Sequence, residues 1–391
     1  MRISKRVVLA GTALATATVA LAGATAGSSA PQTKPPPSPI VGLVNSLNGL
    51  SAQARETRLY NLAKQEGGTL ELYTSLTRTI LPEVVKEFQA KYPAIKVNAY
   101  RASSEDVVAR LTQEASAGAS GADVVETNGT EMLFFQHRAN VLVPYRGSPY
   151  ASSIPDAYRF NTWTADRIEA FVVAWNTNLV GSGQQPTSFQ SLGNSTWSGK
   201  LAMEPTDADW FAALYTYLEK QALSKLKPAA TAAGRRKQKA AVDRGLDAMF
   251  ARIARNSKMI GGHTTLATLL AAGQYSVCVT CHAQSIEALQ DNGAPITFKP
   301  FVQPILIRPQ GIGIVYRLKH KATALLFYDW MLRKDGGQKA LLAGGSNPAR
   351  KDMGDADLAR AKRVNVNLRP IVSHWGFWSN KYEGLVRLAG G

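Results

Sequence analysis

Two cysteines and a histidine form the most distinctive chemical motif of this 391-residue chain. Cys278, Cys281 and His282 are spaced as C-x-x-C-H, and the chain has no other cysteine. This spacing is that of covalent c-type haem attachment, in which both thiols bond the porphyrin and the histidine ligates iron. The flanking residues 274–279 instead predict a buried β-strand, which leaves little room for a macrocycle. A c-type haem electron carrier is therefore kept as an alternative, and we expect no cofactor.

The same two thiols have two further interpretations. An oxidising compartment favours a disulfide between them. A bridge across two residues needs a turn, however, and the alternation of a straight strand places Cys278 and Cys281 on opposite faces. We therefore expect two free thiols, with Cys278 in the core and Cys281 beside His282 at the strand end, next to a cleft. A cysteine and a histidine there would suit softer metals such as zinc or copper.

A second group of candidate residues lies in three polar loops, each of which follows a predicted strand and opens a predicted helix. Free N–H groups and the positive end of a helix dipole favour a negatively charged ligand at such a place. The candidates are Thr74, Ser75 and Thr77 in the first loop, Ser103 and Ser104 in the second, and Thr127 and Asn128 in the third. Together they predict a cleft lined by hydroxyl and amide groups.

A fourth segment favours cations. Asp207, Asp209 and Trp210 follow a predicted strand and begin a predicted helix. Either carboxylate suits a helix N-cap, and either would also pair with a ligand cation in a cleft, while Trp210 would stack on an organic ligand. Trp175 and Asn176 offer an indole N–H and an amide near the expected hinge. A zwitterion, a phosphonate or a metal with its anion would use both kinds of group, so the ligand and any metal stay open.

Alternating strands and helices must position these loops. Strands are predicted at 69–73, 95–100, 123–126, 200–203 and 274–279, and helices at 80–91, 107–115, 211–223 and 264–271. The first of these helices has apolar residues at a 3.6-residue period, and its proline lies in the first turn, where a missing N–H does little harm. The predicted fold class is α/β.

The order of these segments resembles the extracellular solute-binding proteins of ABC importers, particularly the ferric-iron-binding group with the type II periplasmic-binding fold. The similarity covers about residues 68–352. It is carried by Leu72-Tyr73-Thr74-Ser75, the stretch from Phe88 to Pro93, Ala122-Asp123-Val124-Val125, the stretch from Ala174 to Leu179, the proline–tryptophan segment from Pro186 to Leu201, and Asn347-Pro348-Ala349-Arg350.

The resemblance implies two lobes, each a sheet flanked by helices, with a hinge between them. Lobe 1 is expected at 41–172 plus 305–352, lobe 2 at 173–304, and a C-terminal extension at 353–391. The ferric-binding members ligate iron through two adjacent tyrosines in the second lobe. This chain has no adjacent tyrosine pair, so its pattern departs from theirs and direct Fe(III) binding is left open.

The N-terminus has the pattern of a processing segment. A basic start, an apolar stretch and small residues predict a signal peptide at 1–26, and five prolines between 31 and 39 predict a linker at 27–40. A membrane anchor is the alternative. We expect an exported protein, periplasmic or extracellular and associated with the cell envelope.

The net charge of +17 permits binding to anions or anionic surfaces. Its one cluster, on an Ala-rich and predicted helical stretch, consists of Lys225, Lys227, Arg235, Arg236, Lys237, Lys239 and Arg244. No aromatic interleaving or nucleic-acid-binding motif accompanies it, so a solvated helix face is the simpler interpretation and nucleic-acid binding is not expected.

The resulting functional hypothesis is a monomeric solute-binding component of an ABC transporter, which delivers a small polar, anionic or metal ligand to a membrane permease. An enzyme on the same fold is the second alternative. The chain has no G-x-S-x-G, H-E-x-x-H or P-loop motif, so no catalytic activity is expected.

Overall fold

The computed structural model describes residues 38–353 and 361–389. The expected signal peptide and nearly all of the proline-rich linker lie outside the described residues. Among the residues described, none of the helices is long and apolar enough to cross a membrane.

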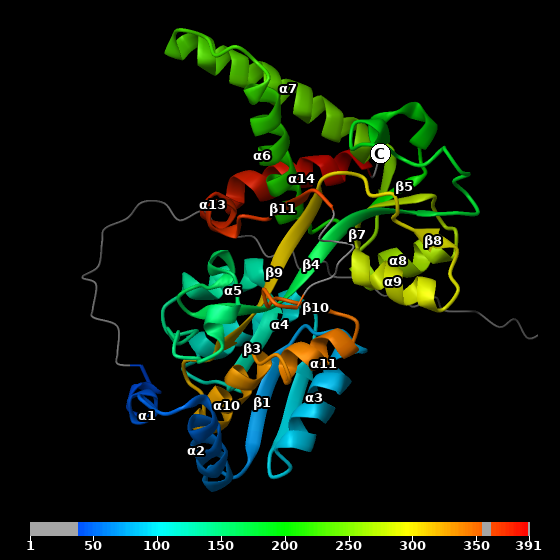
Figure 1. Cartoon of the computed structure of the whole chain (residues 1–391). Coiled ribbons are helices and arrows are strands. Elements are labelled where there is room, and N and C mark those ends of the chain that lie inside the picture. The colour runs from blue at the N-terminus through cyan, green and yellow to red at the C-terminus, as the bar shows by residue number, and fades with distance from the viewer. Residues whose placement is uncertain (1–37, 354–360, 390–391) are drawn as a thin grey trace, which may run out of the picture. The chain divides into compact units, whose positions relative to one another are not determined.

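Eleven strands form one mixed sheet (Figure 1). They are β1 (Thr69–Thr74), β2 (Lys96–Arg101), β3 (Val124–Asn128), β4 (Trp163–Asn176), β5 (Leu201–Met203), β6 (Ser257–Met259), β7 (Val277–His282), β8 (Ile296–Thr297), β9 (Ile305–Ile314), β10 (Asn347–Pro348) and β11 (Arg363–Asn365). The main order is β2-β1-β3-β9-β4-β7-β5-β6. Strands β1, β2 and β3 pair in parallel, as do β5, β6 and β7, whereas β9 and β4 pair antiparallel in the middle.

The two long central strands, β4 and β9, join the two parallel groups (Figure 1). Their register places Glu169 opposite Arg308 and Phe171 opposite Leu306. Two parallel groups joined by two central strands are the arrangement that the sequence predicts for two lobes with a hinge. The predicted boundary at 172/173 falls within β4 and the one at 304/305 at the start of β9; the lobe limits themselves stay predictions.

Helices cover the sheet, and their bounds are α1 (Val41–Ser46), α2 (Ala52–Gln65), α3 (Ile80–Lys91), α4 (Ser104–Ser116), α5 (Gly129–Gln136), α6 (Ala208–Ser224), α7 (Ala232–Arg255), α8 (His263–Ala271), α9 (Ala283–Asp291), α10 (Lys321–Met331), α11 (Gly337–Ala343), α13 (Leu368–Ser373) and α14 (Trp375–Ala389). Short 3-10 helices lie at Ala151–Ser153, Asp156–Tyr158, Ser191–Gly193 and Ser195–Trp197. The apolar face of α3 is buried as its period predicts, and Phe88 packs edge-on against Phe327 and Trp330 of α10.

The elements predicted from the sequence agree with the structure to within a few residues. The bounds of α3 are those predicted, and Ser103 caps α4 by accepting a hydrogen bond from the backbone N–H of Asp106 at 3.2 Å. Most of the basic cluster lies on α7, which extends with α6 away from the sheet (Figure 1). The local signals of period and capping therefore sufficed for these elements.

The C-terminal extension packs against helices from both halves of the sheet. Helix α14 packs on α6 and α7, and α13 packs on α5 and α6. The ring of Trp375 contacts Phe134 of α5, while Trp378 contacts Phe211 and Tyr215 of α6. The extension thus contributes core packing through its aromatic residues.

Candidate functional site

A buried network of ion pairs crosses the middle of the sheet. The guanidinium of Arg167 on β4 donates to Glu126 of β3 at 3.0 Å and to Glu169 at 2.8 Å. Arg308 on β9 donates to Glu169 at 3.1 Å and to Asp209, in the first turn of α6, also at 3.1 Å. Each of these five residues is at most 6% exposed. Since burying charges is costly, such a network needs nearly complete pairing to persist.

The strand pleat explains why these groups meet. Residues two apart on a strand share a face, so Arg167, Glu169 and Phe171 project to the same side of β4. The register places Arg308 directly opposite Glu169, and the Arg308 guanidinium also lies over the Phe171 ring, 4.7 Å from its centroid. The charged network is therefore built mainly by the two central strands and not by loops.

The charges of this network are mutually supported. Burial opposes ionisation of Glu169, but the guanidiniums of Arg167 and Arg308 outweigh it and hold its pKa well below the usual value. Burial likewise disfavours the charged guanidinium of Arg308, yet the surrounding carboxylates, Asp209 and Glu169 foremost, raise its pKa. Nearby on α5, burial raises the pKa of Glu131 to about 8. Both members of the Glu169–Arg308 pair are thus charged at neutral pH.

A second cluster lies beside the network, where β5 leads into α6 and where α8 begins. The imidazole Nε2 of His263 lies 3.2 Å from Asp207 Oδ1. One ligand atom from each of Glu204, Asp207 and His263 lies within 4.8 Å of the other two. Asp207 occupies the N-cap position of α6, but its side chain caps no N–H, and its Oδ2 is buried without a hydrogen-bond partner. The N-cap interpretation therefore does not account for this carboxylate.

Glu204 is held in place by its neighbours. Its Oε2 accepts a hydrogen bond from the N–H of Thr206 at 2.6 Å, and its Oε1 accepts one from Gly262 at 3.3 Å. Gly262 adopts a φ of +87°, a conformation that only glycine takes without strain, and it directly precedes α8. This turn brings the start of α8 to the end of β5 and so places His263 beside Asp207.

Two imidazoles stack in this cluster. The rings of His263 and His282 lie 3.7 Å apart between centroids, with an interplanar angle of 23°. Burial alone would lower the pKa of His263, but Asp207 and Glu204 outweigh it and raise the pKa to about 9. Burial lowers the pKa of His282 well below its usual value, although Glu169 lies 3.4 Å from its Nε2. At neutral pH, His263 is therefore protonated and His282 is neutral.

The hydroxyl-rich loops of the first parallel group reach the network from the other side. Thr74 donates to Glu126 Oε2 at 2.6 Å. The hydroxyls of Ser75 and Thr127 are buried without partners, and Asn128 pairs with Gln310 across β3 and β9. Thr130, in the first turn of α5, donates to Asp209 of α6 at 2.8 Å, so the two groups of elements are joined directly across the site.

A hollow of about 440 Å³ opens beside this region. It is lined by Glu287 of α9, by Leu342 in the last turn of α11 and by residues between Gly345 and Met353, which follow α11. Within that lining, Pro348 pairs with Arg167 of β4, and the buried amide nitrogen of Asn347 has no hydrogen-bond partner. Polar atoms without partners at the ends of several strands are typical of a place that holds a ligand or water.

Comparison with known proteins places the chain in a family. A model of the bacterial extracellular solute-binding proteins matches residues 83–364. The chain is a bacterial extracellular solute-binding protein. It is 23% identical, over 307 residues, to the Fe(3+)-binding periplasmic protein of Serratia marcescens, an alignment that covers 72% of this chain and 82% of the relative.

Solved structures show the same fold. The ferric binding protein from Campylobacter jejuni matches with a TM-score of 0.63 and 20% identity, covering 81% of this chain and 99% of that one. The periplasmic binding protein AfuA from Actinobacillus pleuropneumoniae, with fructose-6-phosphate bound, matches with a TM-score of 0.63 and 19% identity, covering 82% and 99%. The predicted two-lobed type II periplasmic-binding fold is confirmed, and the protein is a solute-binding component of the ABC-transporter type.

The structure gives several sequence-predicted site residues of this solute-binding protein structural roles. Trp210 is 1% exposed and packs between Phe189 and Phe250. The amide nitrogen of Asn176 donates to the carbonyl of Leu270 at 2.9 Å, and its oxygen accepts from the N–H of Asn178.

Three more candidates lie in the core or at helix starts. Trp175 is buried on β4. Ser104 is buried in the first turn of α4, where the neighbouring Ser103 is the N-cap. Thr77 accepts a hydrogen bond from the N–H of Ile80 at the start of α3. Packing and helix capping therefore account for these residues, and Thr74, Ser75, Thr127, Asn128, Asp207, Asp209 and His282 are the predicted residues that lie at or beside the charged network.

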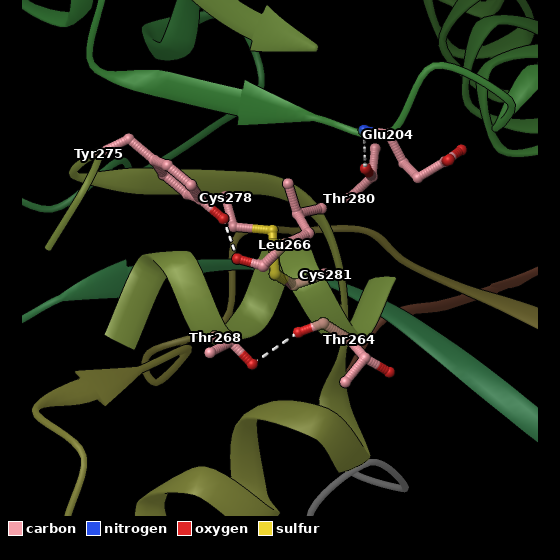
Figure 2. Close-up of a disulfide and its surroundings, with 8 residues drawn as sticks. All are labelled: Glu204, Thr264, Leu266, Thr268, Tyr275, Cys278, Thr280 and Cys281. Atoms are coloured by element: carbon pink, nitrogen blue, oxygen red, sulfur yellow. Dashed lines mark hydrogen bonds between the residues drawn. A yellow bond between two sulfur atoms is a disulfide. The ribbon is translucent and has the colours of Figure 1, made fainter. Parts of the chain in front are cut away.

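The expectation of two free thiols is wrong, because Cys278 and Cys281 form a disulfide (Figure 2). The strand is not straight: Cys281 pairs with Val172 and Cys278 with Ala174, so three steps along β7 oppose two along β4. A bulge of this kind shifts the alternation and places residues three apart on one face. Both sulfurs are used in the bridge, so Cys281 offers no thiolate to a metal and neither cysteine offers a thiol for haem attachment.

Sequence reasoning missed the centre of the site. Glu126, Arg167, Glu169 and Arg308 lie within strands that are otherwise apolar, and the signal that marks them is a charged side chain in a strand buried on both faces. His263 directly precedes the helix predicted at 264–271 and belongs to no motif. Its partner Glu204 carried no motif of its own.

Proposed function

We propose that this protein captures a small, positively charged solute between its two lobes and delivers it to the membrane permease of an ABC importer. One observation carries the proposal. Buried ionisable groups from both parallel halves of the sheet converge on the central strands, with Thr130 hydrogen-bonded to Asp209 across them. Solute-binding folds of this kind close around a ligand by hinge motion at such strands.

The charge of the site supports a cationic solute. Five buried carboxylates, those of Glu126, Glu169, Glu204, Asp207 and Asp209, lie at the site with three cationic groups, the guanidiniums of Arg167 and Arg308 and the imidazole of His263. A buried excess of carboxylates costs free energy unless a cation compensates it. The hydroxyl-rich loops, which by themselves favour an anion, supply neutral contacts beside these acids.

Similar proteins bind different solutes, so the solute of this protein has to be inferred from its own residues. One similar protein is named for Fe(3+) and another holds fructose-6-phosphate, so the shared fold accommodates unlike solutes. Function on a common fold has to be argued from the site. In this chain, the acidic cluster around Asp207 and Asp209 favours a cationic solute over an anionic one.

Export, reversible binding and a monomeric state complete the proposal. The basic start and the apolar stretch of residues 1–26 support export. The permease would recognise the closed form, and the solute would leave unchanged, without a catalytic step.

Native mass spectrometry of the exported protein tests this proposal. We expect a small bound mass that leaves on unfolding, and a smaller radius of gyration for the loaded protein than for the dialysed one. Asp209→Asn should lose the bound mass. Glu66→Gln is the control, because Glu66 accepts hydrogen bonds only from the start of α10, at Ala322 and Thr323. Absence of any bound solute and of any compaction, or chemical turnover of the solute, would refute the proposal.

A further inference from the structure

We propose that Glu204, Asp207 and His263 form a binding site for a divalent transition-metal ion. The inference rests on the proposed function, since it names the class of the captured solute. Two carboxylates and one imidazole, each offering a ligand atom within 4.8 Å of the others, come from the β5–α6 junction and the start of α8. Catalytic zinc sites likewise use three protein ligands from histidine, carboxylate or cysteine and leave a further position for another ligand.

The donors are incomplete without a ligand. Asp207 is 2% exposed, yet its Oδ2 has no hydrogen-bond partner, and the Nδ1 of His263 has none either. A buried carboxylate oxygen without a partner costs about 1–3 kcal/mol or more. A metal ion bound by Asp207 would remove this cost.

A second imidazole points to the same ligand independently. His282 is 6% exposed, and its Nε2 has no hydrogen-bond partner. Its ring stacks on His263 at 3.7 Å. Its Nε2 lies 3.4 Å from Glu169 without forming a hydrogen bond, so the buried imidazole next to His263 keeps a nitrogen without a hydrogen-bond partner at the edge of the cluster.

The surrounding groups hold these donors in position. The N–H groups of Thr206 and Gly262 orient the carboxylate of Glu204. Two hydrogen bonds also fix the backbone of Glu204. Its N–H donates to Thr280 Oγ1 at 3.0 Å, as Figure 2 shows, and its carbonyl accepts from the hydroxyl of Tyr382. Outer contacts of this kind fix ligand orientation in metal sites.

The donor chemistry selects the class of metal. Imidazole with carboxylate suits zinc and its divalent first-row neighbours, whereas calcium and magnesium prefer oxygen alone. Sulfur is excluded by the Cys278–Cys281 disulfide. Fe(III), which favours hard oxygen donors, finds no adjacent pair of tyrosines in this chain.

Charge supports a cation here. Arg308 lies 3.8 Å from Asp207 Oδ1, but it is already paired with Glu169 and Asp209. It therefore leaves the two carboxylates of Asp207 and Glu204 with a single imidazole, that of His263, as their remaining partner.

Titration calorimetry of the metal-stripped, full-length protein with Zn²⁺ tests the inference, with Co²⁺ absorption as a report on coordination. We expect one Zn²⁺ per chain, with Mg²⁺ and Ca²⁺ unbound at the same concentrations. Asp207→Asn and His263→Asn should each weaken binding by about 100-fold or more, since even loss of an outer contact costs 10–100-fold. Circular dichroism before the titration confirms that each variant is folded.

His320→Asn is the matched control. His320 pairs with Asp123 at 2.7 Å, and its side chain is 20% exposed, as is that of His263. Its loss should leave Zn²⁺ affinity unchanged. If Zn²⁺ binds equally well to Asp207→Asn and His263→Asn, the assigned site is wrong.

Two further outcomes separate this inference from the proposed function. If the protein does not bind Zn²⁺ but has an organic solute bound in native mass spectrometry, the metal site is wrong and the proposed solute capture is supported. A protein that binds neither overturns both.

Discussion

Two carboxylate–imidazole pairs in this protein have the same composition and nearly the same burial, but different surroundings. Asp123 and His320 lie 2.7 Å apart, with side chains 1% and 20% exposed; Asp207 and His263 lie 3.2 Å apart, with side chains 2% and 20% exposed. The oxygens of Asp123 also accept hydrogen bonds from the backbone N–H groups of Glu71, Lys319 and His320 at 2.8–2.9 Å. Asp207 keeps one buried oxygen without a partner.

The difference separates a structural pair from a ligand-binding one. Three backbone N–H groups from two segments, β1 and the residues before α10, satisfy Asp123, which directly precedes β3. The pair therefore connects these segments and has no capacity left for a ligand. Asp207 is left incomplete next to Glu204, His263 and His282. Buried polar groups are normally satisfied, so we expect a ligand to complete the hydrogen bonding of the cluster at the β5–α6 junction.

The largest expected effect is on stability at the complete pair. Asp123→Ala should lower the free energy of unfolding by about 3–5 kcal/mol, because it leaves several buried donors without an acceptor. Asp207→Ala should lower it by less, since one oxygen of Asp207 has no partner and His263 can release its proton when the carboxylate is lost. Urea unfolding of both variants without metal measures the difference. Equal losses would mean that the two pairs are alike.

Metal binding should depend on the Asp207–His263 pair and not on the Asp123–His320 pair. Zn²⁺ at about 100 times its Kd should stabilise the protein by about 2.7 kcal/mol, and a chelator should reverse the gain. Thermal unfolding with and without Zn²⁺ compares two matched variants. His320→Asn should keep the stabilisation by Zn²⁺, and His263→Asn should lose it. A shift that survives in His263→Asn contradicts the assignment.

The disulfide provides a smaller effect. Replacing both Cys278 and Cys281 by Ala should cost about 2 kcal/mol, as expected for closing so short a loop. Because the bulge in β7 also sets the position of His282, Zn²⁺ affinity should fall, while the Asp123–His320 pair is unaffected. Denaturant midpoints of wild type and the double variant, each with and without reductant, check the first point. Reductant should lower the denaturant midpoint of the wild type and leave that of the double variant unchanged.

The smallest effect concerns Glu131, next to the incomplete cluster. Its pKa is raised to about 8 in the folded protein, whereas an unfolded glutamate titrates near about 4.3. Between these values the folded state keeps a proton that the unfolded state releases, so stability falls as pH rises toward 8. The residue is partly exposed although its Oε2 is buried, so the effect is modest.

Glu131→Gln removes this penalty. The variant should match wild type near pH 4.5 and exceed it by about 1 kcal/mol at pH 8, since one pKa unit corresponds to about 1.4 kcal/mol and partial exposure reduces it. Urea unfolding at the two pH values measures the gain. A constant difference across pH would show that Glu131 does not titrate as its burial requires.

The elements of the fold were predictable because their signals are local. The period of α3, the serine cap of α4 and the apolar strands β1 to β3 each depend on a few neighbouring residues. The order of the motifs then indicated the two-lobed family, and the model match over residues 83–364 confirms it. Of the candidate site, the loop residues Asp207 and Asp209 were found because carboxylates at a helix start are visible in the sequence.

What only the tertiary structure decided is pairing across long separations. The sequence by itself determined the strands, the helices and the chemical types available. It did not determine that a bulge turns Cys278 toward Cys281, because register is a property of two strands together. Nor did it determine that Arg308 meets Glu169, 139 residues away, or that His263 stacks on His282. Such contacts depend on how the whole sheet packs, and the free energy of burying each charge depends on which partner the fold supplies.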